Sequence, residues 1–151
     1  MKNEYTMNKQ FVVFKLEQQY YGVDIQIVQI IERMKSIMRV PKASACIKGV
    51  MNLRGEIIPV VDMRTKFGLE ARAYDEDTRI IIVKIDEDMI GIIVDQVKEV
   101  IELSSEQIET VPNMQDKTNA NHVQGVGKLK EEDMIVTLLN LGTIIEEAFE
   151  V

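Results

Sequence analysis

The chain has 151 residues, of which 46% are hydrophobic and 28% are charged. This length suits one globular domain or two closely fused small ones, and the hydrophobic fraction excludes a disordered chain. The 18 Lys and Arg residues and 25 Asp and Glu residues give a net charge of −7. An acidic surface repels phosphate and anionic lipid, so we expect no nucleic-acid partner.

The chain carries few signals for export or for catalysis. Its first ten residues contain no apolar block typical of a signal peptide, and it has no run of 18 uncharged apolar residues. We therefore expect a cytoplasmic protein without direct membrane insertion. The single cysteine, Cys46, cannot form an internal disulfide or a metal cage alone. With one Cys and one His, a binding module without cofactor or metal is favoured over an enzyme.

Short apolar runs rich in β-branched residues predict strands along most of the chain. Polar turns at 17–19 and 86–88 join neighbouring runs and predict two hairpins. The predicted strands are 11–16, 20–23, 47–53, 57–61, 80–85, 89–94 and 134–139.

Helices are expected to be few and short. Apolar residues at 27, 28, 30 and 31 predict a helix over 25–32. Polar residues at three other places are expected to cap short helices. These are Asp62 before a turn through Phe67, Asn140 before a helix over 141–149, and Ser104 with Gln107 in a capping-box pattern.

The two halves of the chain share a pattern of anchor residues in the same order. The pattern predicts an internal duplication within one domain over 1–151, with copies over about 11–69 and about 80–149. Short, numerous strands usually close into barrels, so we expect a mainly β fold of two five-stranded barrels packed on a shared core. The paired anchors are Gly22 and Gly91, Pro41 and Pro112, Gly49 and Gly125, and Asp62 and Asn140.

Most polar residues that suggest chemistry also have a plain explanation. His122 lies in a polar connector and is expected to face solvent, and Cys46 is expected to be a small, partly buried apolar side chain. The acidic runs 75–77 and 86–88 lack the alternating oxygen ligands of a calcium loop and are expected to be solvated turns.

The most distinctive short motif is Asn-Leu-Arg-Gly-Glu at 52–56. Gly55 suits the positive φ of a tight turn. Arg54 suits a role in gripping carboxylates or carbonyls of a partner, with simple solvation as the alternative. Val28 and Ile31, one turn apart on the predicted helix, are expected to line either the core or an exposed groove.

Several segments together resemble the CheW family of chemotaxis coupling proteins. The central block at 47–64 reads IKGVMNLRGEIIPVVDMR, with YGVDI before it at 21–25 and IGIIVDQV after it at 90–97. The likeness extends from about Phe11 to about Phe149. It implies a non-catalytic scaffold with two SH3-like β-barrel subdomains and a C-terminal helix.

The resemblance implies that the chain links the cytoplasmic tip of methyl-accepting chemoreceptors to the regulatory domain of the histidine kinase CheA. Recruitment to receptor arrays at the inner face of the membrane is then expected. The absence of an attached kinase or receiver sequence favours a stand-alone coupling protein. Receptor binding is assigned to Val28, Ile31, Gly49, Asn52 and Arg54, and kinase binding to Ile37, Met38 and Arg39.

Two other functions stay open at this point. The first is a carboxylate-based hydrolase or transferase that uses acids in the loops. A deep pocket lined by Asp or Glu with raised pKa values would favour it. The second is a subunit of an unrelated β-barrel assembly, which recovery of a receptor or a histidine kinase as partner would exclude.

Overall fold

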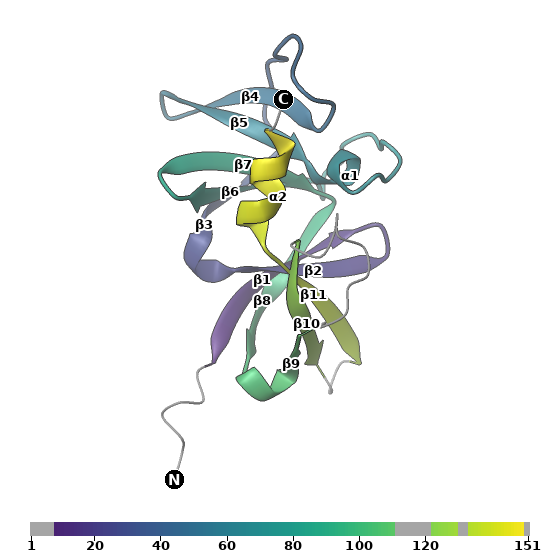
Figure 1. The fold of residues 1–151 in the computed structure, drawn as a ribbon. Coiled ribbons are helices and arrows are strands. Elements are labelled where there is room, and N and C mark those ends of the chain that lie inside the picture. The colour runs from purple at the N-terminus through teal and green to yellow at the C-terminus, as the bar shows by residue number, and fades with distance from the viewer. Residues whose placement is uncertain (1–7, 111–121, 130–132, 150–151) are drawn as a thin grey trace.

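The protein is described from a computed structural model that covers residues 8–110, 122–129 and 133–149. It is mainly β, with two sheets, one above the other, and the C-terminal helix α2 runs from near their junction along the upper, five-stranded sheet (Figure 1). The five-stranded sheet has the order β3-β6-β7-β5-β4 and the six-stranded sheet the order β8-β1-β2-β11-β10-β9.

The strands are β1 (Lys9–Leu16), β2 (Gln19–Asp24), β3 (Val28–Arg33), β4 (Ile47–Leu53), β5 (Glu56–Asp62), β6 (Arg79–Ile85), β7 (Asp88–Val94), β8 (Gln96–Leu103), β9 (Ile108–Glu109), β10 (Val123–Leu129) and β11 (Met134–Leu139). The helices are α1 (Met63–Lys66) and α2 (Leu141–Ala148), and the 3₁₀ turns are η1 (Ile25–Ile27) and η2 (Ser105–Gln107). The predicted strands are all present, within one or two residues of their expected ends.

Both predicted hairpins are confirmed. In β1–β2, Leu16 pairs with Gln19, and in β6–β7, Ile85 pairs with Asp88, so each turn has two residues. The first turn residue has a positive φ in each, 57° at Glu17 and 56° at Asp86. Such turns match the twist of the flanking strands, which explains why a short polar break between apolar runs was sufficient to predict them.

The three predicted caps are also confirmed. The Asp62 carboxylate accepts from the backbone N–H of Arg64 at 2.9 Å, and α1 ends at Phe67. Asn140 Oδ1 accepts from the backbone N–H of Thr143 at 3.3 Å at the start of α2. Each of these side chains accepts a hydrogen bond from a backbone N–H that has no acceptor within its helix. Gln107 Oε1 accepts from the backbone N–H of Ser104 at 2.9 Å in the capping box.

The predicted helix over 25–32 is wrong. Asp24 accepts from the backbone N–H of Gln26 at 2.9 Å, but it starts only the 3₁₀ turn η1, and the chain continues as β3. Strand β3 pairs with β6, with a register shift between Val28 and Ile30. Because the side of β6 that faces away from β7 would otherwise keep unpaired backbone groups, pairing outweighs the helical spacing of the apolar residues.

Each sheet contains strands from both halves of the sequence. Strands β1 and β2 pair with β8 and β11, and β6 and β7 pair with β3 and β5. The pairings β2–β11 and β5–β7 are parallel. The sheets therefore interlock the two halves of the sequence. The internal duplication stays a prediction, and so does the closure of either sheet into a five-stranded barrel. One sheet has six strands because β9 extends it.

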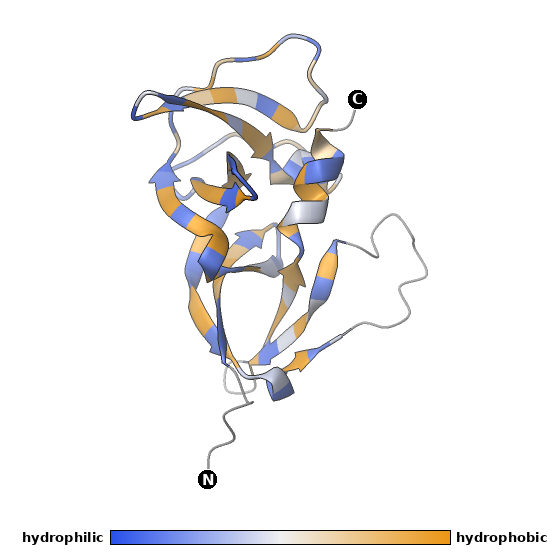
Figure 2. Ribbon diagram, turned by 60° about the vertical axis from the view of Figure 1, so that its left-hand side comes forward, coloured by the Kyte–Doolittle hydropathy of each residue, from blue (hydrophilic) through white to orange (hydrophobic). Residues whose placement is uncertain are grey.

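The core has three clusters, one between the sheets and one within each sheet. Strand β1 contributes to two of them, since Phe14 lies in the inter-sheet core and Val13 in the core of the six-stranded sheet. Figure 2 shows hydrophobic and hydrophilic residues interspersed along the strands, as expected for strands with one face in a core and one in solvent. Cys46 is half-buried against the inter-sheet core, as predicted. The predicted core shared between two sheet systems is thus present.

Candidate partner-binding surface

The β4–β5 turn presents Arg54 to solvent in a defined position. Leu53 pairs with Glu56, and the two turn residues between them both have positive φ, 51° at Arg54 and 88° at Gly55. Asn52 Oδ1 accepts from the backbone N–H of Gly55 at 2.8 Å. Positive φ at both central positions defines a type I′ turn. Gly55 adopts a positive φ without steric cost, and the Asn52 side chain holds the turn by its hydrogen bond to Gly55. Arg54 is therefore an exposed cation on a rigid tip.

Gly49 allows another segment of the chain, called here the crossing segment, to pair with β4 at the edge of the sheet. The backbone N–H of Met38 donates to the carbonyl of Val50, and the N–H of Val50 donates to the carbonyl of Met38, both at 2.8 Å. A Cβ on Gly49 would lie 2.1 Å from the Met38 carbonyl oxygen and 2.9 Å from Cγ2 of Ile37. The φ of Gly49 is also positive, at 152°. Gly49 is buried and offers no side chain, so the receptor binding predicted for it could act only through the segment that it positions.

The segment that crosses β4 exposes the residues predicted to bind the kinase. Met38 is 72% exposed and Val40 is 44% exposed. Arg39 is also exposed, whereas Ile37 is half-buried against the core of the five-stranded sheet. Exposed apolar side chains on an anchored backbone are typical of protein-binding surfaces.

Val28 and Ile31 lie on β3 and not on a helix. Val28 pairs with Val83 and packs partly against the inter-sheet core, whereas Ile31 pairs with Ile81 and is 41% exposed. They therefore do not share one helical face, contrary to the prediction. Strands β3 and β4 are opposite edges of the five-stranded sheet, so backbone pairing does not join these residues to the β4–β5 turn.

A buried ion cluster at the junction of the sheets was not predicted. Arg64 on α1 is 5% exposed and donates to Asp95 Oδ2 at 2.6 Å, to the carboxylate of Glu17 and to the carbonyl of Glu70. Burial lowers the pKa of the Arg64 guanidinium, but the two carboxylates raise it by more, so it lies above its ordinary value. Since Glu17 belongs to the β1–β2 turn, Arg64 links the two sheets.

His122 is 7% exposed, so the prediction of a solvent-facing histidine is wrong. Its Nε2 lies 2.9 Å from Glu147 Oε2 on α2, and Lys66 on α1 donates to Glu147 Oε1 at 2.6 Å. The backbone carbonyl of His122 accepts a hydrogen bond from the backbone N–H of Asn140 at 2.8 Å, and this bond holds His122 beside α2. Hydrogen bonds from Lys66 and then His122 hold the pKa of the Glu147 carboxyl below its ordinary value.

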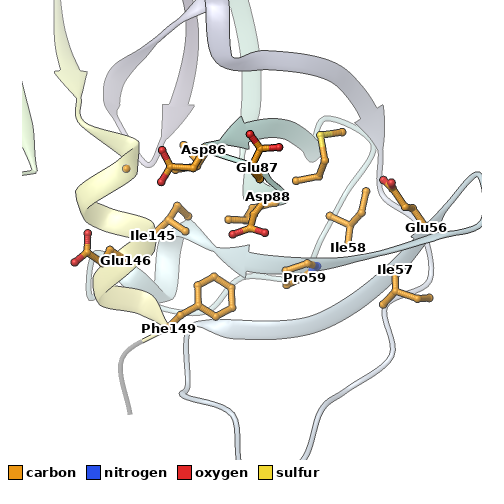
Figure 3. A pocket seen from close by; sticks show the side chains of 14 residues that line it. Glu56, Ile57, Ile58, Pro59, Asp86, Glu87, Asp88, Ile145, Glu146 and Phe149 are labelled. Carbon is orange, nitrogen blue, oxygen red and sulfur yellow. The ribbon is translucent and has the colours of Figure 1, made fainter.

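A groove of about 700 Å³ opens between β5, the β6–β7 turn and α2 (Figure 3). None of the eight residues predicted for partner binding lines it. Away from this groove, the structure brings Gly49 together with Ile37 and Met38, and it places Arg54 on the β4–β5 turn at the end of the same strand. The groove is a separate surface, and the sequence motifs contribute to it only Glu56, at the end of the motif at 52–56, and the acids at 86–88.

Comparison with known proteins identifies the family. A family model described as CheW-like domain matches residues 10–149. The chain is 36% identical over 131 residues to a chemotaxis protein CheW of Klebsiella aerogenes, covering 87% of this chain and 79% of the relative. It is 34% identical over 142 residues to a chemotaxis protein CheW of Helicobacter pylori, covering 93% of this chain and 83% of the relative.

The fold agrees with this assignment. The crystal structure of the scaffolding protein TtCheW from Thermoanaerobacter tengcongensis matches with a TM-score of 0.84 and 37% identity, covering 93% of this chain and 94% of that one. Among the described residues, no helix has the length and apolar character needed to cross a membrane. A match over nearly the whole chain in both sequence and fold shows that this chain belongs to the CheW family.

Proposed function

We propose that this chain is a chemotaxis coupling protein, a scaffold that connects chemoreceptors to the histidine kinase CheA. The observation that carries the proposal is the match of residues 10–149 to the CheW-like domain, together with the similarity to a scaffolding protein of the same fold. The finer proposal is that the receptor partner is the cytoplasmic tip and the kinase partner is the regulatory domain of CheA.

Three parts of the five-stranded sheet and its neighbouring segment are proposed to meet these partners. Arg54 at the β4–β5 turn would grip receptor carboxylates or carbonyls, with Asn52 fixing the turn. Met38 and Arg39 on the crossing segment would contact the kinase, with Gly49 and Ile37 fixing that segment. Val28 and Ile31 on β3 form a third, separate part of the proposed receptor surface.

Coupling by such a scaffold needs no bond chemistry. A scaffold transmits a signal when its contacts with receptor and kinase have different free energies in the two signalling states. Separate contact surfaces for the two partners allow both to be bound at once. The anchored backbone at Gly49 and the type I′ turn favour binding of both partners, because a preorganised surface loses little conformational entropy on binding.

A carboxylate-based hydrolase or transferase has no support from the relatives, which are named as chemotaxis proteins. The groove does contain acids, but Glu56, Asp86, Glu87, Asp88 and Glu146 are all exposed. A catalytic acid usually needs an apolar setting that raises its pKa. The geometry of the groove thus favours binding over catalysis.

The test is to titrate the purified chain with a CheA regulatory domain and with a receptor-tip fragment, first separately and then together. Calorimetry should detect binding to each, and the two together should form a ternary complex. Binding to neither partner would contradict the proposed function. Binding to one only, or mutually exclusive binding, would contradict the scaffold mechanism.

A further inference from the structure

The crossing segment continues into a loop over 39–46, which returns to the sheet at the start of β4. The two hydrogen bonds between Met38 and Val50 close the base of this loop. Arg39 and Val40 lie directly after the base, and both are exposed. Each residue of a loop loses conformational freedom when the loop is ordered, so bonds at the base alone do not fix its far end. The loop therefore needs a second anchor.

The second anchor is a hydrogen bond between Ser44 and the end of α2. Ser44 Oγ donates to the backbone carbonyl of Ala148 at 2.9 Å, although the two residues are 104 positions apart in the sequence. Ser44 Oγ also lies 3.6 Å from Cys46 Sγ within the loop itself. Ala148 is the last residue of α2, and a carbonyl in the last turn of a helix has no donor within that helix. Ser44 supplies this donor and thereby ties the loop to α2.

The backbone of the loop has a conformation that depends on such an anchor. Lys42, two residues before Ser44, has a φ of 66°, in the left-handed region that residues with a Cβ seldom adopt. Pro41 precedes it and has no backbone N–H with which to form a hydrogen bond. Strained positions of this kind persist only where surrounding contacts fix them. We attribute the order of this part of the loop to the hydrogen bond of Ser44.

The last turn of α2 is itself held from outside the helix. It carries two carboxylates, Glu146 and Glu147, and no basic residue, which is unfavourable beside the partly negative C-terminus of a helix. Lys66 on α1 donates to Glu147 Oε1 at 2.6 Å and supplies a cation. His122 Nε2 lies 2.9 Å from Glu147 Oε2. These contacts hold the last turn, and with it the carbonyl of Ala148.

The last turn of α2 thus joins three separate parts of the molecule. Helix α1 follows β5 of the five-stranded sheet, whereas His122 directly precedes β10 of the six-stranded sheet. The loop over 39–46 is the third part, and it meets α2 where the helix has run along the upper sheet (Figure 1). The position of the loop therefore depends on contacts made by both sheets.

We infer that the last turn of α2 positions the proposed kinase-binding surface, with Ser44 and Glu147 as positioning residues that do not touch the kinase themselves. The inference rests on the proposed function, which assigns Met38 and Arg39 to the kinase contact. A loop already held in one conformation loses little conformational entropy on binding. Release of the loop from α2 should therefore weaken kinase binding, whereas receptor binding through Arg54 on the β4–β5 turn should stay unchanged.

Amide hydrogen exchange of the purified chain tests the anchor without any partner. The backbone N–H of Ile47 donates to the Ser44 carbonyl at 3.0 Å, so its exchange reports opening of the loop. Ser44→Ala should speed this exchange about fivefold, because one hydrogen bond of the side chain is lost. Ser44→Thr keeps the hydroxyl and should leave it unchanged. The amide of Ile81, buried in β6, should exchange equally in all variants.

The matched control for this measurement is Ser36→Ala. Ser36 is also exposed, but it precedes the loop and the Met38–Val50 pair. The control should leave the exchange of Ile47 unchanged. Equal exchange of Ile47 in Ser44→Ala and in the unmodified chain would overturn the inference, and so would equal acceleration by Ser44→Ala and by the control.

A double-mutant cycle tests whether Glu147 acts on the loop through α2. Glu147→Gln alone should speed the exchange of Ile47 about twofold, because the last turn of α2 loses an ion pair. Adding Glu147→Gln to Ser44→Ala should have no further effect, since a loop already released from α2 no longer depends on that turn. Effects that multiply in the double variant would overturn the inference.

Calorimetric titration connects the anchor to function. Ser44→Ala should weaken binding of the CheA regulatory domain about threefold and leave binding of a receptor-tip fragment unchanged, and Ser44→Thr should restore kinase binding. A residue that only stabilised the whole fold would affect both partners alike, so equal weakening would overturn the inference. Failure of the unmodified chain to bind the regulatory domain would contradict the proposed function instead, and the exchange of Ile47 would then decide alone whether α2 anchors the loop.

Discussion

Two regions of the molecule use the same backbone arrangement for different purposes. In the five-stranded sheet, Gly49 lies beneath the crossing segment at Met38. In the six-stranded sheet, Gly125 lies beside Glu109 of the paired strand β9, and a Cβ on Gly125 would be 2.8 Å from the Glu109 carbonyl oxygen. Both glycines follow a register shift in their hairpins. The arrangement recurs at positions that the proposed duplication relates.

The side chains differ where the backbone agrees. Met38 is 72% exposed, whereas Glu109 forms an ion pair with Lys128 at 2.9 Å. Ile108, beside it, packs against the core of the six-stranded sheet. The crossing strand therefore contributes to the architecture of both sheets, but only the first one displays apolar side chains suited to a partner. This difference separates the structural role of the glycines from the proposed binding role of the residues above them.

The largest effect is expected for Gly49→Ala. The added methyl group would collide with the Met38 carbonyl and would require a positive φ, so unfolding should become easier by about 4 kcal/mol. Gly125→Ala is the matched control, and it should cost about 2 kcal/mol because the contact is longer. Urea denaturation measures both. A smaller cost at Gly49 than at Gly125 would show that the first crossing is the looser one.

The next effect concerns α1, which carries Arg64 where α2 has Gly142 at the related position. Arg64→Met should destabilise the fold by about 3 kcal/mol, since it removes the buried cation that hydrogen-bonds the nearly buried Asp95 and leaves only the exposed Arg72, 3.6 Å away. Adding Asp95→Asn should recover part of this loss in a double-mutant cycle. Purely additive effects would show that the ion cluster does not hold the sheets together.

A small, pH-dependent effect is expected at Glu147, which joins α1 to α2 through Lys66 and to His122. Because its pKa is lowered in the fold, ionised Glu147 stabilises the protein above the ordinary pKa near 4.3, and this contribution disappears as the pH falls through the lowered value. Glu147→Gln should cost about 0.5 kcal/mol at pH 7. Thermal unfolding should show the two proteins converging below about pH 4. A constant difference across that range would contradict the assignment.

The elements predicted correctly are those with local signals. The polar breaks at 17–19 and 86–88 predicted the hairpins, and Asp62 and Asn140 predicted the helix starts, because these interactions involve neighbouring residues only. Strand β3 was mistaken for a helix because its partner β6 is distant in sequence. The interlocking of the two halves was not foreseen for the same reason, since a repeat pattern does not say which copy a strand pairs with.

Of the candidate partner-binding surface, the sequence predicted only the part that the motif at 52–56 forms. Arg54 and Gly55 were placed correctly at a turn because a glycine between two apolar runs signals one. The burial of Arg64, His122 and Asp95 depends on contacts between distant segments, so their residue types gave no warning. The local signals for the groove were the acidic turn at 86–88 and Glu56 of the motif at 52–56, which the fold brings together beside α2.

The most direct test of the central claim compares the two crossing strands in binding. Binding of the CheA regulatory domain should weaken about tenfold in Met38→Ser with Arg39→Ala, which corresponds to about 1.4 kcal/mol. It should stay unchanged in Glu109→Ala, which alters the related position of the other sheet. Calorimetric titration gives both values. Unchanged binding by the first variant and weakened binding by the second would contradict the account.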